Sequence, residues 1–352
     1  MIVLFFLLLT AGFIALIKGA DLFVDGSSAL AKAFHVPGLI IGLTIVAIGT
    51  SMPELAVSTV AAFNGSSEIA LSNVVGSNIF NLLGVLGICA LIHAVPVESG
   101  INRRDIPVMV VTTLFVLFGT CAHTVFSGQF IKTDMSAQLG VIGRVIGLIL
   151  LIVFIGYICY LIYNAKKHPV KDDGSTDQKP IRNPASQPGH PCPGKTFLPE
   201  FLPTSCLWKS VLFIIIGIVL ILAGGEGVVY ASKEIARSFG MSETLIGVTI
   251  VAVGTSLPEL VTSIVAARKG EAGMAVGNIV GSNIFNLLFI LGVSAFIRPV
   301  AVNAASVWDM LILSVVCLIS YVFCLTGKTI DRKEGVVMLL LYIADVVFAI
   351  FR

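Results

Sequence analysis

The sequence predicts an all-α membrane protein of ten transmembrane helices, arranged as two inverted five-helix repeats. Three observations support this fold class: the composition, ten long apolar segments and an internal repeat. Of the 352 residues, 57% are hydrophobic and 12% are charged, whereas an average soluble domain carries about 25% charge. Because a soluble protein must keep a wetted surface, this composition excludes an ordinary soluble enzyme, a nucleic-acid-binding protein and a disordered chain.

Ten segments are long and apolar enough to cross a bilayer, which takes about 20 residues per helix. The first contains Lys18 and Asp21 but lacks the basic start of a signal peptide, so we interpret it as a span. The second and seventh each contain a proline followed by a glutamate, and the third and eighth contain small polar residues. The predicted spans are residues 2–33, 36–63, 67–93, 105–123, 138–164, 209–238, 241–267, 272–297, 306–326 and 334–351.

One long polar segment, residues 165–208, separates a first five-helix half (1–164) from a second, inverted half (209–352). It is rich in Pro, Gly, Ser and Lys, which is typical of a flexible linker. Its aspartates allow a calcium-sensing loop as an alternative, but they lack EF-hand spacing. Because cytoplasmic loops carry an excess of Lys and Arg, the segment is predicted to be cytoplasmic, with both termini outside. Lys233 and Arg237, near the opposite end of the sixth span, argue against this orientation.

The two halves share a repeated sequence. At a shift of 205 residues, 42–87 aligns with 247–292 with 29 identities in 46 positions. GTSMPEL aligns with GTSLPEL, and both copies contain VGSNIFNLL. Because five is an odd number of spans, the second copy crosses the membrane in the opposite sense. Inverted repeats are typical of secondary transporters, whose substrate site lies near the bilayer midplane at the repeat interface.

Glu54 and Glu259 are expected in the middle of apolar spans, with no basic residue near them in the sequence. A carboxylate at that depth costs several kcal/mol unless it has a partner. Two such carboxylates on repeat-related helices therefore indicate a bound cation. The alternative is a protonated carboxylic acid that is hydrogen-bonded to a neighbouring helix.

A proline precedes each glutamate directly, at Pro53 and Pro258. Proline lacks the N–H that would bond the carbonyl four residues earlier, so each helix is expected to break and to expose carbonyl oxygens near Gly49 and Gly254. Hydroxyl groups flank each break. Carbonyl, hydroxyl and carboxylate oxygens together suit hard cations such as Ca²⁺ and Na⁺. The hydroxyl-bearing residues are Thr50, Ser51, Thr255 and Ser256.

The GSNIFN motif is predicted to supply a second wall of the site. Ser77 and Asn81 are four residues apart and share one helix face, as do Ser282 and Asn286. For each of these residues taken alone, a hydrogen bond that joins two helices is the alternative role.

Five further polar residues are expected to have structural roles. Asn78 and Asn283 point away from the face of the motif that we assign to the site, and we expect them to hydrogen-bond the broken backbone. Asp21, Asp25 and Glu226 lie near polar helix ends, and we interpret them as interface or structural acids.

These motifs resemble the alpha-repeats of the calcium/cation antiporter superfamily, which includes the sodium/calcium exchangers, over nearly the whole chain. The resemblance implies an antiporter rather than an enzyme, with Ca²⁺ and Na⁺ as transported ions and no cofactor. It implies that Glu54 and Glu259 ligate Ca²⁺ with the carbonyls of Thr50 and Thr255. It also implies neighbouring Na⁺ pockets, with two asparagines lining the middle of the cluster. The pocket residues are Ala47, Ser51 and Ser77 in one half and Ala252, Ser256 and Ser282 in the other, and the asparagines are Asn81 and Asn286.

One position departs from the family pattern. Several relatives, including potassium-dependent ones, carry Asp where this chain has Asn286, so the site has two fixed negative charges rather than three. This predicts exchange that does not depend on K⁺. The resemblance and the inverted repeat together imply Na⁺/Ca²⁺ exchange by alternating access. We expect this exchange to be electrogenic, because about three places for Na⁺ would bring the loaded site to +1. The alternatives are an H⁺/Ca²⁺ antiporter, with Glu54 or Glu259 as proton carrier, and a cation channel. The expected setting is the lipid bilayer of a plasma membrane or cell inner membrane, with no nucleic acid and no obligate protein partner.

Overall fold

The computed structural model describes residues 2–65, 67–97, 100–131, 133–167, 204–239, 254–326 and 329–351. Within these ranges, eight helices are long and apolar enough to cross a membrane, and a pair of helices bent by 49° can form a ninth span. The predicted span 241–267 is described only from residue 254 on, where α12 (Leu257–Arg268) forms its second part. The described residues therefore form an all-α membrane protein, and the order of their helices is consistent with the predicted ten helices in two inverted repeats.

The elements of the first half follow the predicted spans closely. The second span is a broken helix, and the third contains a π-helical turn, η2. In chain order the elements are α1 (Ile2–Ala33), α2 (Gly38–Ile41), η1 (Gly42–Val46), α3 (Ala47–Thr50), α4 (Met52–Asn64), α5 (Ser67–Ile79), η2 (Phe80–Val85), α6 (Leu86–Ile92), β1 (Val95–Pro96), η3 (Ile101–Asp105), α7 (Ile106–Ser127), η4 (Gln129–Ile131), β2 (Gln138–Ile142) and α8 (Arg144–Lys167).

The described part of the second half follows the same order. Its π-helical turn, η6, occupies nearly the same place as η2 when the sequence is shifted by 205 residues. The described elements are α9 (Thr204–Ser238), α12 (Leu257–Arg268), α13 (Ala272–Phe285), η6 (Asn286–Ile290), α14 (Leu291–Ile297), β3 (Val300–Asn303), α15 (Ala304–Thr326), β4 (Thr329–Ile330) and α16 (Arg332–Phe351).

Two short antiparallel sheets were not predicted. β1 pairs with β4, and β2 pairs with β3, so each sheet joins the two halves. The prediction that the fifth span begins at residue 138 is wrong, because residues 138–142 form β2 and α8 begins at Arg144. Gly140 lets the strand lie close to α7, since a Cβ there would lie 2.9 Å from the carbonyl oxygen of Thr120. Only a glycine lets the chain pass that close.

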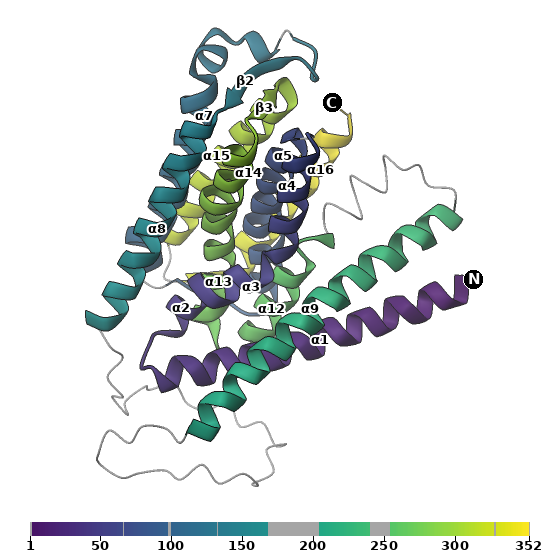
Figure 1. The fold of residues 1–352 in the computed structure, drawn as a ribbon, viewed down its shortest axis with the longest axis vertical. Helices are drawn as coiled ribbons and strands as arrows, with labels where there is room; N and C mark the ends of the chain where they lie inside the picture. The colour runs from purple at the N-terminus through teal and green to yellow at the C-terminus, as the bar shows by residue number, and fades with distance from the viewer. Residues whose placement is uncertain are drawn as a thin grey trace.

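Helices α1 and α9 form an antiparallel pair that crosses beside the remaining helices (Figure 1). Their backbones meet at Gly19 and Gly217. A Cβ on either glycine would lie 2.9 Å from the carbonyl oxygen of the other. Small residues allow this close approach where lipid leaves no hydrophobic driving force between helices.

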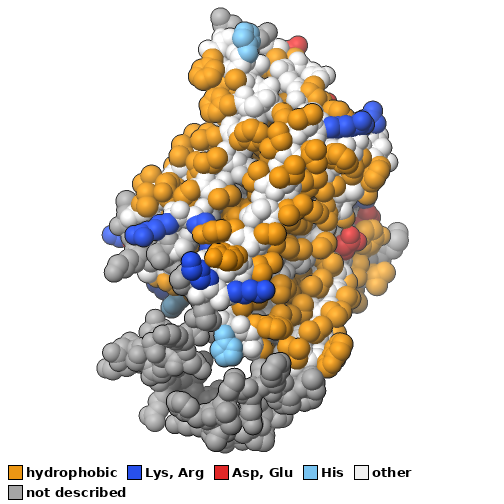
Figure 2. All heavy atoms as spheres, turned by 60° about the vertical axis from the view of Figure 1, so that its left-hand side comes forward, with side chains coloured by type: hydrophobic (Ala, Val, Ile, Leu, Met, Phe, Trp, Pro, Cys, Tyr) orange, Lys and Arg blue, Asp and Glu red, His pale blue; other side chains and the backbone are white. Residues whose placement is uncertain are grey.

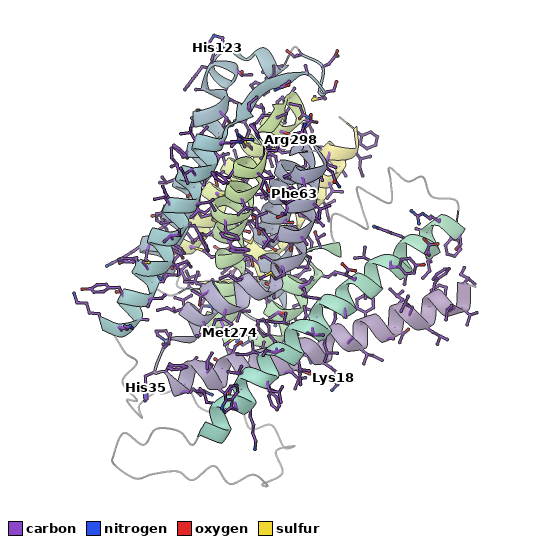
Figure 3. The ribbon with its side chains drawn as sticks, viewed as in Figure 1. Lys18, His35, Phe63, His123, Met274 and Arg298 are labelled. Carbon is purple, nitrogen blue, oxygen red and sulfur yellow. The ribbon has the colours of Figure 1, made fainter. Side chains whose placement is uncertain are left out.

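The core consists of two groups of buried hydrophobic residues. One lies along α1 and α9 with neighbouring parts of α12 and α13, and the other fills the rest of the bundle. Large hydrophobic side chains such as Val145 and Ile155 on α8 are exposed, as expected of a lipid-facing helix. Hydrophobic side chains cover most of the face in Figure 2. His35 and His123 lie at opposite ends of the bundle, and Met274 is buried close to α1 (Figure 3).

We expect Gly19→Leu to destabilise the folded protein, because its side chain would overlap the backbone of α9. Overpacking of this kind typically costs about 1–3 kcal/mol. Thermal unfolding in detergent should show a lower midpoint than the wild type. Gly156→Leu is the matched control, since no described atom lies within 4 Å of a Cβ at Gly156 on α8. Equal midpoints for the two variants would contradict the close packing of α1 on α9.

Candidate functional site

Each repeat has a non-helical serine directly after its Gly-Thr pair, just before the helix that contains the glutamate. In the first half this serine is Ser51, with φ −85° and ψ 13°, between α3 and α4. In the second half it is Ser256, with φ −95° and ψ 10°, just before α12. Pro53 and Pro258 lie in the first turn after the break, where a missing N–H removes no helical hydrogen bond. The predicted break is therefore confirmed at Ser51. The residues that directly precede Gly254 lie outside the described residues, so the second break stays a prediction.

Glu54 and Glu259 are fully buried, in the first turns of α4 and α12. A helix N-terminus carries a partial positive charge, which favours a carboxylate at that position. Among the ion pairs of the described residues, none joins a Lys or Arg to either glutamate. Local helix geometry alone stabilises these charges only partly.

The two halves exchange hydrogen bonds at the glutamates. The Ser51 hydroxyl donates to Glu259 Oε1 at 2.7 Å, and the Ser256 hydroxyl donates to Glu54 Oε1 at 3.0 Å. Ser77 is at the limit of hydrogen bonding to Glu54 Oε1, at 3.5 Å. Each carboxylate therefore depends on a hydroxyl from the opposite half, which brings the two breaks together at one point.

Asparagines of α5 and α13 join the same centre. Asn78 Nδ2 donates to the Asn283 carbonyl at 3.2 Å, and Asn283 Nδ2 donates to the Asn78 carbonyl at 3.4 Å. The expectation that these two residues bond the broken helices is therefore wrong. Asn81 Nδ2 donates to Asn283 Oδ1 at 3.2 Å, and Asn286 Nδ2 donates to Asn78 Oδ1 at 3.0 Å. Asn81 and Asn286 lie in the π-helical turns η2 and η6, and such turns are frequent at functional sites.

The residues that do bond the broken helices were missed in the sequence. Asn73 Nδ2 donates to the Glu54 carbonyl at 3.2 Å, and Asn278 Nδ2 is 3.4 Å from the Glu259 carbonyl. Asn278 Oδ1 also accepts from the Thr50 hydroxyl at 3.0 Å. Asn73 and Asn278 are identical across the repeat and lie one helical turn before the serine of each GSNIFN motif, so the repeat alignment contained the signal.

The centre contains buried oxygen atoms that have no hydrogen-bond partner among the described residues. Leaving a buried polar atom unsatisfied costs about 1–3 kcal/mol, and more for a charged group. All of them can act as ligands, and their mixture of carboxylate, amide and hydroxyl oxygens fits a hard cation. They are Glu54 Oε2, Glu259 Oε2, Asn81 Oδ1, Asn286 Oδ1, Ser282 Oγ and Thr255 Oγ1.

The structure brings together the predicted site residues that it describes. Thr255 is partly buried, Ala252 lies outside the described residues, and the others are buried. The carbonyl of Ala47 already accepts bonds from the Ser51 N–H at 3.1 Å and the Thr50 hydroxyl at 3.4 Å. The assignment of each residue to Ca²⁺ or Na⁺ stays a prediction. The buried residues are Ala47, Thr50, Ser51, Glu54, Ser77, Asn81, Ser256, Glu259, Ser282 and Asn286.

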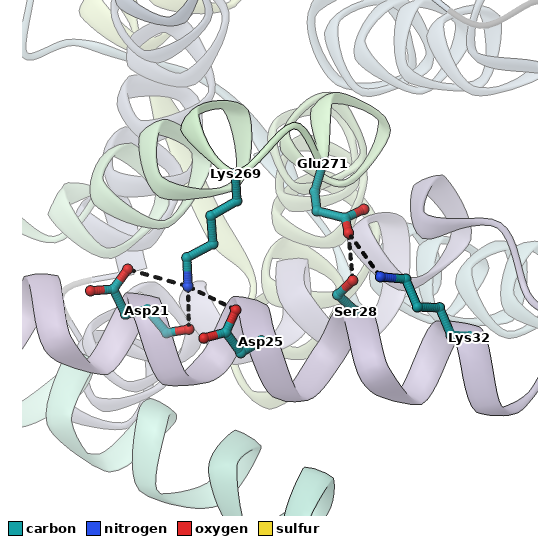
Figure 4. Close-up of polar contacts among 6 residues, drawn as sticks. All are labelled: Asp21, Asp25, Ser28, Lys32, Lys269 and Glu271. Atoms are coloured by element: carbon teal, nitrogen blue, oxygen red, sulfur yellow. Dashed lines mark hydrogen bonds and ion pairs between the residues drawn. The ribbon is translucent and has the colours of Figure 1, made fainter. Parts of the chain in front are cut away.

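Asp21 and Asp25 of α1 are interface acids, as predicted. Lys269, at the end of α12, lies 2.8 Å from Asp25 Oδ1 and 3.3 Å from Asp21 Oδ1, and it donates to the Asp21 carbonyl at 3.0 Å. Beside it, Glu271 accepts a hydrogen bond from Ser28, and Figure 4 shows both groups of contacts. They fasten α1 to the turn between α12 and α13.

A family model described as sodium/calcium exchanger protein matches residues 4–163 and 209–351. The chain belongs to this family. It is therefore an integral membrane transporter and not an enzyme. The matched ranges include both helix breaks, both GSNIFN motifs and both glutamates.

Two related proteins align with almost the whole chain. The chain is 33% identical to the sodium/calcium exchanger MaX1 of Methanosarcina acetivorans, over 99% of both chains. It is 34% identical to the putative antiporter CaxA of Alkalimonas amylolytica, over 94% of both chains. Among solved structures, the sodium-calcium exchanger NCX_Mj soaked with 2.5 mM Na⁺ and 0.1 mM Ca²⁺ is similar with a TM-score of 0.75, at 29% identity over 99% of each chain.

We expect Glu54→Gln and Glu259→Gln each to weaken Ca²⁺ binding by about 100-fold or more, because each removes half of the fixed negative charge in a buried site. Equilibrium binding of ⁴⁵Ca²⁺ to purified protein measures this effect. Glu68→Gln is the control, since Glu68 is an exposed acid on α5. Wild-type affinity in both glutamate variants would place the calcium site elsewhere.

Proposed function

We propose that the protein is a secondary active antiporter that exchanges Na⁺ for Ca²⁺ by alternating access. The observation that carries the proposal is the pair of buried glutamates, each with one oxygen held by a serine of the opposite half and one oxygen unsatisfied. The similarity to MaX1 and NCX_Mj, each of which is named a sodium/calcium exchanger, supports the proposal.

The site chemistry explains why the two ions compete. Glu54 and Glu259 give a fixed charge of −2, which one Ca²⁺ neutralises. Na⁺ needs the same carboxylates, so the two ions exclude each other. The buried oxygens of Asn81, Asn286 and Ser282 are neutral and have no hydrogen-bond partner among the described residues. Such neutral oxygens suit the lower charge of additional Na⁺ ions.

Asn286 supports exchange that is independent of K⁺. Its amide nitrogen is engaged with Asn78 Oδ1, so the position offers one neutral oxygen in place of a carboxylate. The centre then lacks a third negative charge that an additional monovalent cation would neutralise.

We further propose that residues 165–208 are cytoplasmic and that both termini are outside, in a plasma membrane or cell inner membrane. Lys166 and Lys167 end α8, and Arg103 and Arg104 lie at the start of the preceding span. An excess of Lys and Arg on one side supports a cytoplasmic location for that side.

A vesicle flux experiment tests the exchange. In vesicles loaded with Na⁺, an outward Na⁺ gradient should drive ⁴⁵Ca²⁺ uptake, and replacing all K⁺ by choline should leave the rate unchanged. Glu54→Gln provides the inactive control. Uptake that needs a pH gradient and no Na⁺ would instead indicate the H⁺/Ca²⁺ antiporter, and loss of uptake in choline would show that K⁺ is required.

We expect the exchange to move net charge. The calcium position and a Na⁺ pocket on each side of it give about three places for Na⁺, so the Na⁺-loaded site reaches +1 while the Ca²⁺-loaded site is neutral. One net charge is worth about 2.3 kcal/mol per 100 mV. Uptake should therefore change with the potential set by valinomycin and K⁺. A rate and end-point independent of voltage would indicate two Na⁺ per Ca²⁺.

A further inference from the structure

A pocket of about 330 Å³ lies between α9 and the two helix breaks. Its inner wall includes Pro53, Pro258 and Thr255, and its α9 wall includes Glu226 and Lys233. We call this cavity the α9 pocket. Glu226 lies beyond the middle of α9, toward its Ser238 end, so the pocket is on the side away from Lys166 and Lys167.

The inner wall of the α9 pocket is next to the buried glutamates in the sequence. Pro53 and Pro258 directly precede Glu54 and Glu259. The hydroxyl oxygen of Thr255 is buried and has no hydrogen-bond partner among the described residues. The next residue, Ser256, donates to Glu54. A cation in this pocket would therefore contact Thr255, which directly precedes the serine that donates to Glu54.

Glu226 is the one carboxylate that lines the α9 pocket. Its side chain is exposed, and no ion pair or hydrogen bond involves it among the described residues. The sequence predicted a structural or interface role for Glu226, but the described residues provide no contact for such a role. Lys233, about 10 Å further along the helix, is the only basic residue in the same lining.

The repeat provides an internal comparison. At the shift of 205, Glu226 aligns with Asp21 and Thr255 aligns with Thr50. Asp21 is bound by Lys269 (Figure 4). The Thr50 hydroxyl is bonded to Asn278. The same chemical groups are thus satisfied by protein contacts on one side of the molecule. On the other side, Glu226 lines a cavity, and the Thr255 hydroxyl is buried with no hydrogen-bond partner among the described residues.

We infer that Glu226 recruits the transported cations, holding hydrated Ca²⁺ or Na⁺ in the α9 pocket before the ion reaches Glu54 and Glu259. This inference rests on the proposed function. An unpaired carboxylate in a cavity with apolar walls concentrates cations and speeds their arrival. The volume suffices for a hydrated ion, because a water molecule takes about 30 Å³.

Glu226→Gln tests the inference in ⁴⁵Ca²⁺ flux measurements with Ca²⁺ varied on one face at a time, using intact cells and everted vesicles. On the face of the α9 pocket, the apparent KM for Ca²⁺ should rise about 3- to 10-fold with kcat unchanged. On the opposite face, KM should not change. Lys233→Gln should lower KM on the pocket face, because it removes a repelling charge.

Glu234→Gln is the matched control, since Glu234 is on the same helix, pairs with Arg237 and does not line the pocket. An unchanged KM in Glu226→Gln, an equal change on both faces, or a fall in kcat alone would overturn the inference. Exchange of Na⁺ for Ca²⁺ by the wild-type protein is measured first and tests the proposed function. The comparison of KM between Glu226→Gln and the wild type then tests the role of Glu226, so the two hypotheses can fail separately.

Discussion

The whole architecture depends on two carboxylates that are buried where a membrane protein can least accommodate charge. Glu54 is held by Ser256 and Glu259 by Ser51, so each half of the chain satisfies the acid of the other half. A serine bond satisfies one oxygen of each carboxylate and leaves the second oxygen for a cation. Neither half completes the centre alone, and a lone buried carboxylate would cost several kcal/mol. The crossed bonds therefore couple the folding of the repeats to the formation of the site.

The same constraint explains which helices are central. Broken backbone at membrane depth is tolerated only where protein or a cavity satisfies it, and the amides of Asn73 and Asn278 bond the carbonyls of the two glutamates. These asparagines require α5 and α13 to lie directly against the breaks. Accordingly, 78% of the residues are buried in the apolar stretch that includes α5, and 83% in the stretch that includes α13. In α16 the buried share is 11%. The outer helices face lipid and need only hydrophobic side chains.

Much of this could be predicted from the sequence, because the repeat duplicates the residues under the strongest constraint. Pro53 and Pro258 indicate helix breaks by their covalent structure, and Glu54 and Glu259 stand out in apolar spans. The crossed serine bonds could not be predicted, because they depend on how the two halves meet in space. The partners of Asn78 and Asn283 were assigned wrongly for the same reason. β2 was missed because a five-residue apolar strand resembles a helix start until β3 pairs with it.

Two nearly identical motifs occupy different surroundings, and local chemistry cannot account for the difference. Thr50 is bonded while Thr255 lines a cavity, although seven-residue segments around them differ at one position. The difference lies in the tertiary surroundings of the two motifs. Lys269 favours the observed arrangement of α1 through its ion pairs with Asp21 and Asp25. The equivalent position in the first half is the uncharged Asn64, so these ion pairs have no counterpart there. A partly exposed pair is worth about 0–1 kcal/mol, a population ratio of about fivefold at most. A bias of this size is compatible with the alternating access that we propose, because it favours one arrangement only weakly.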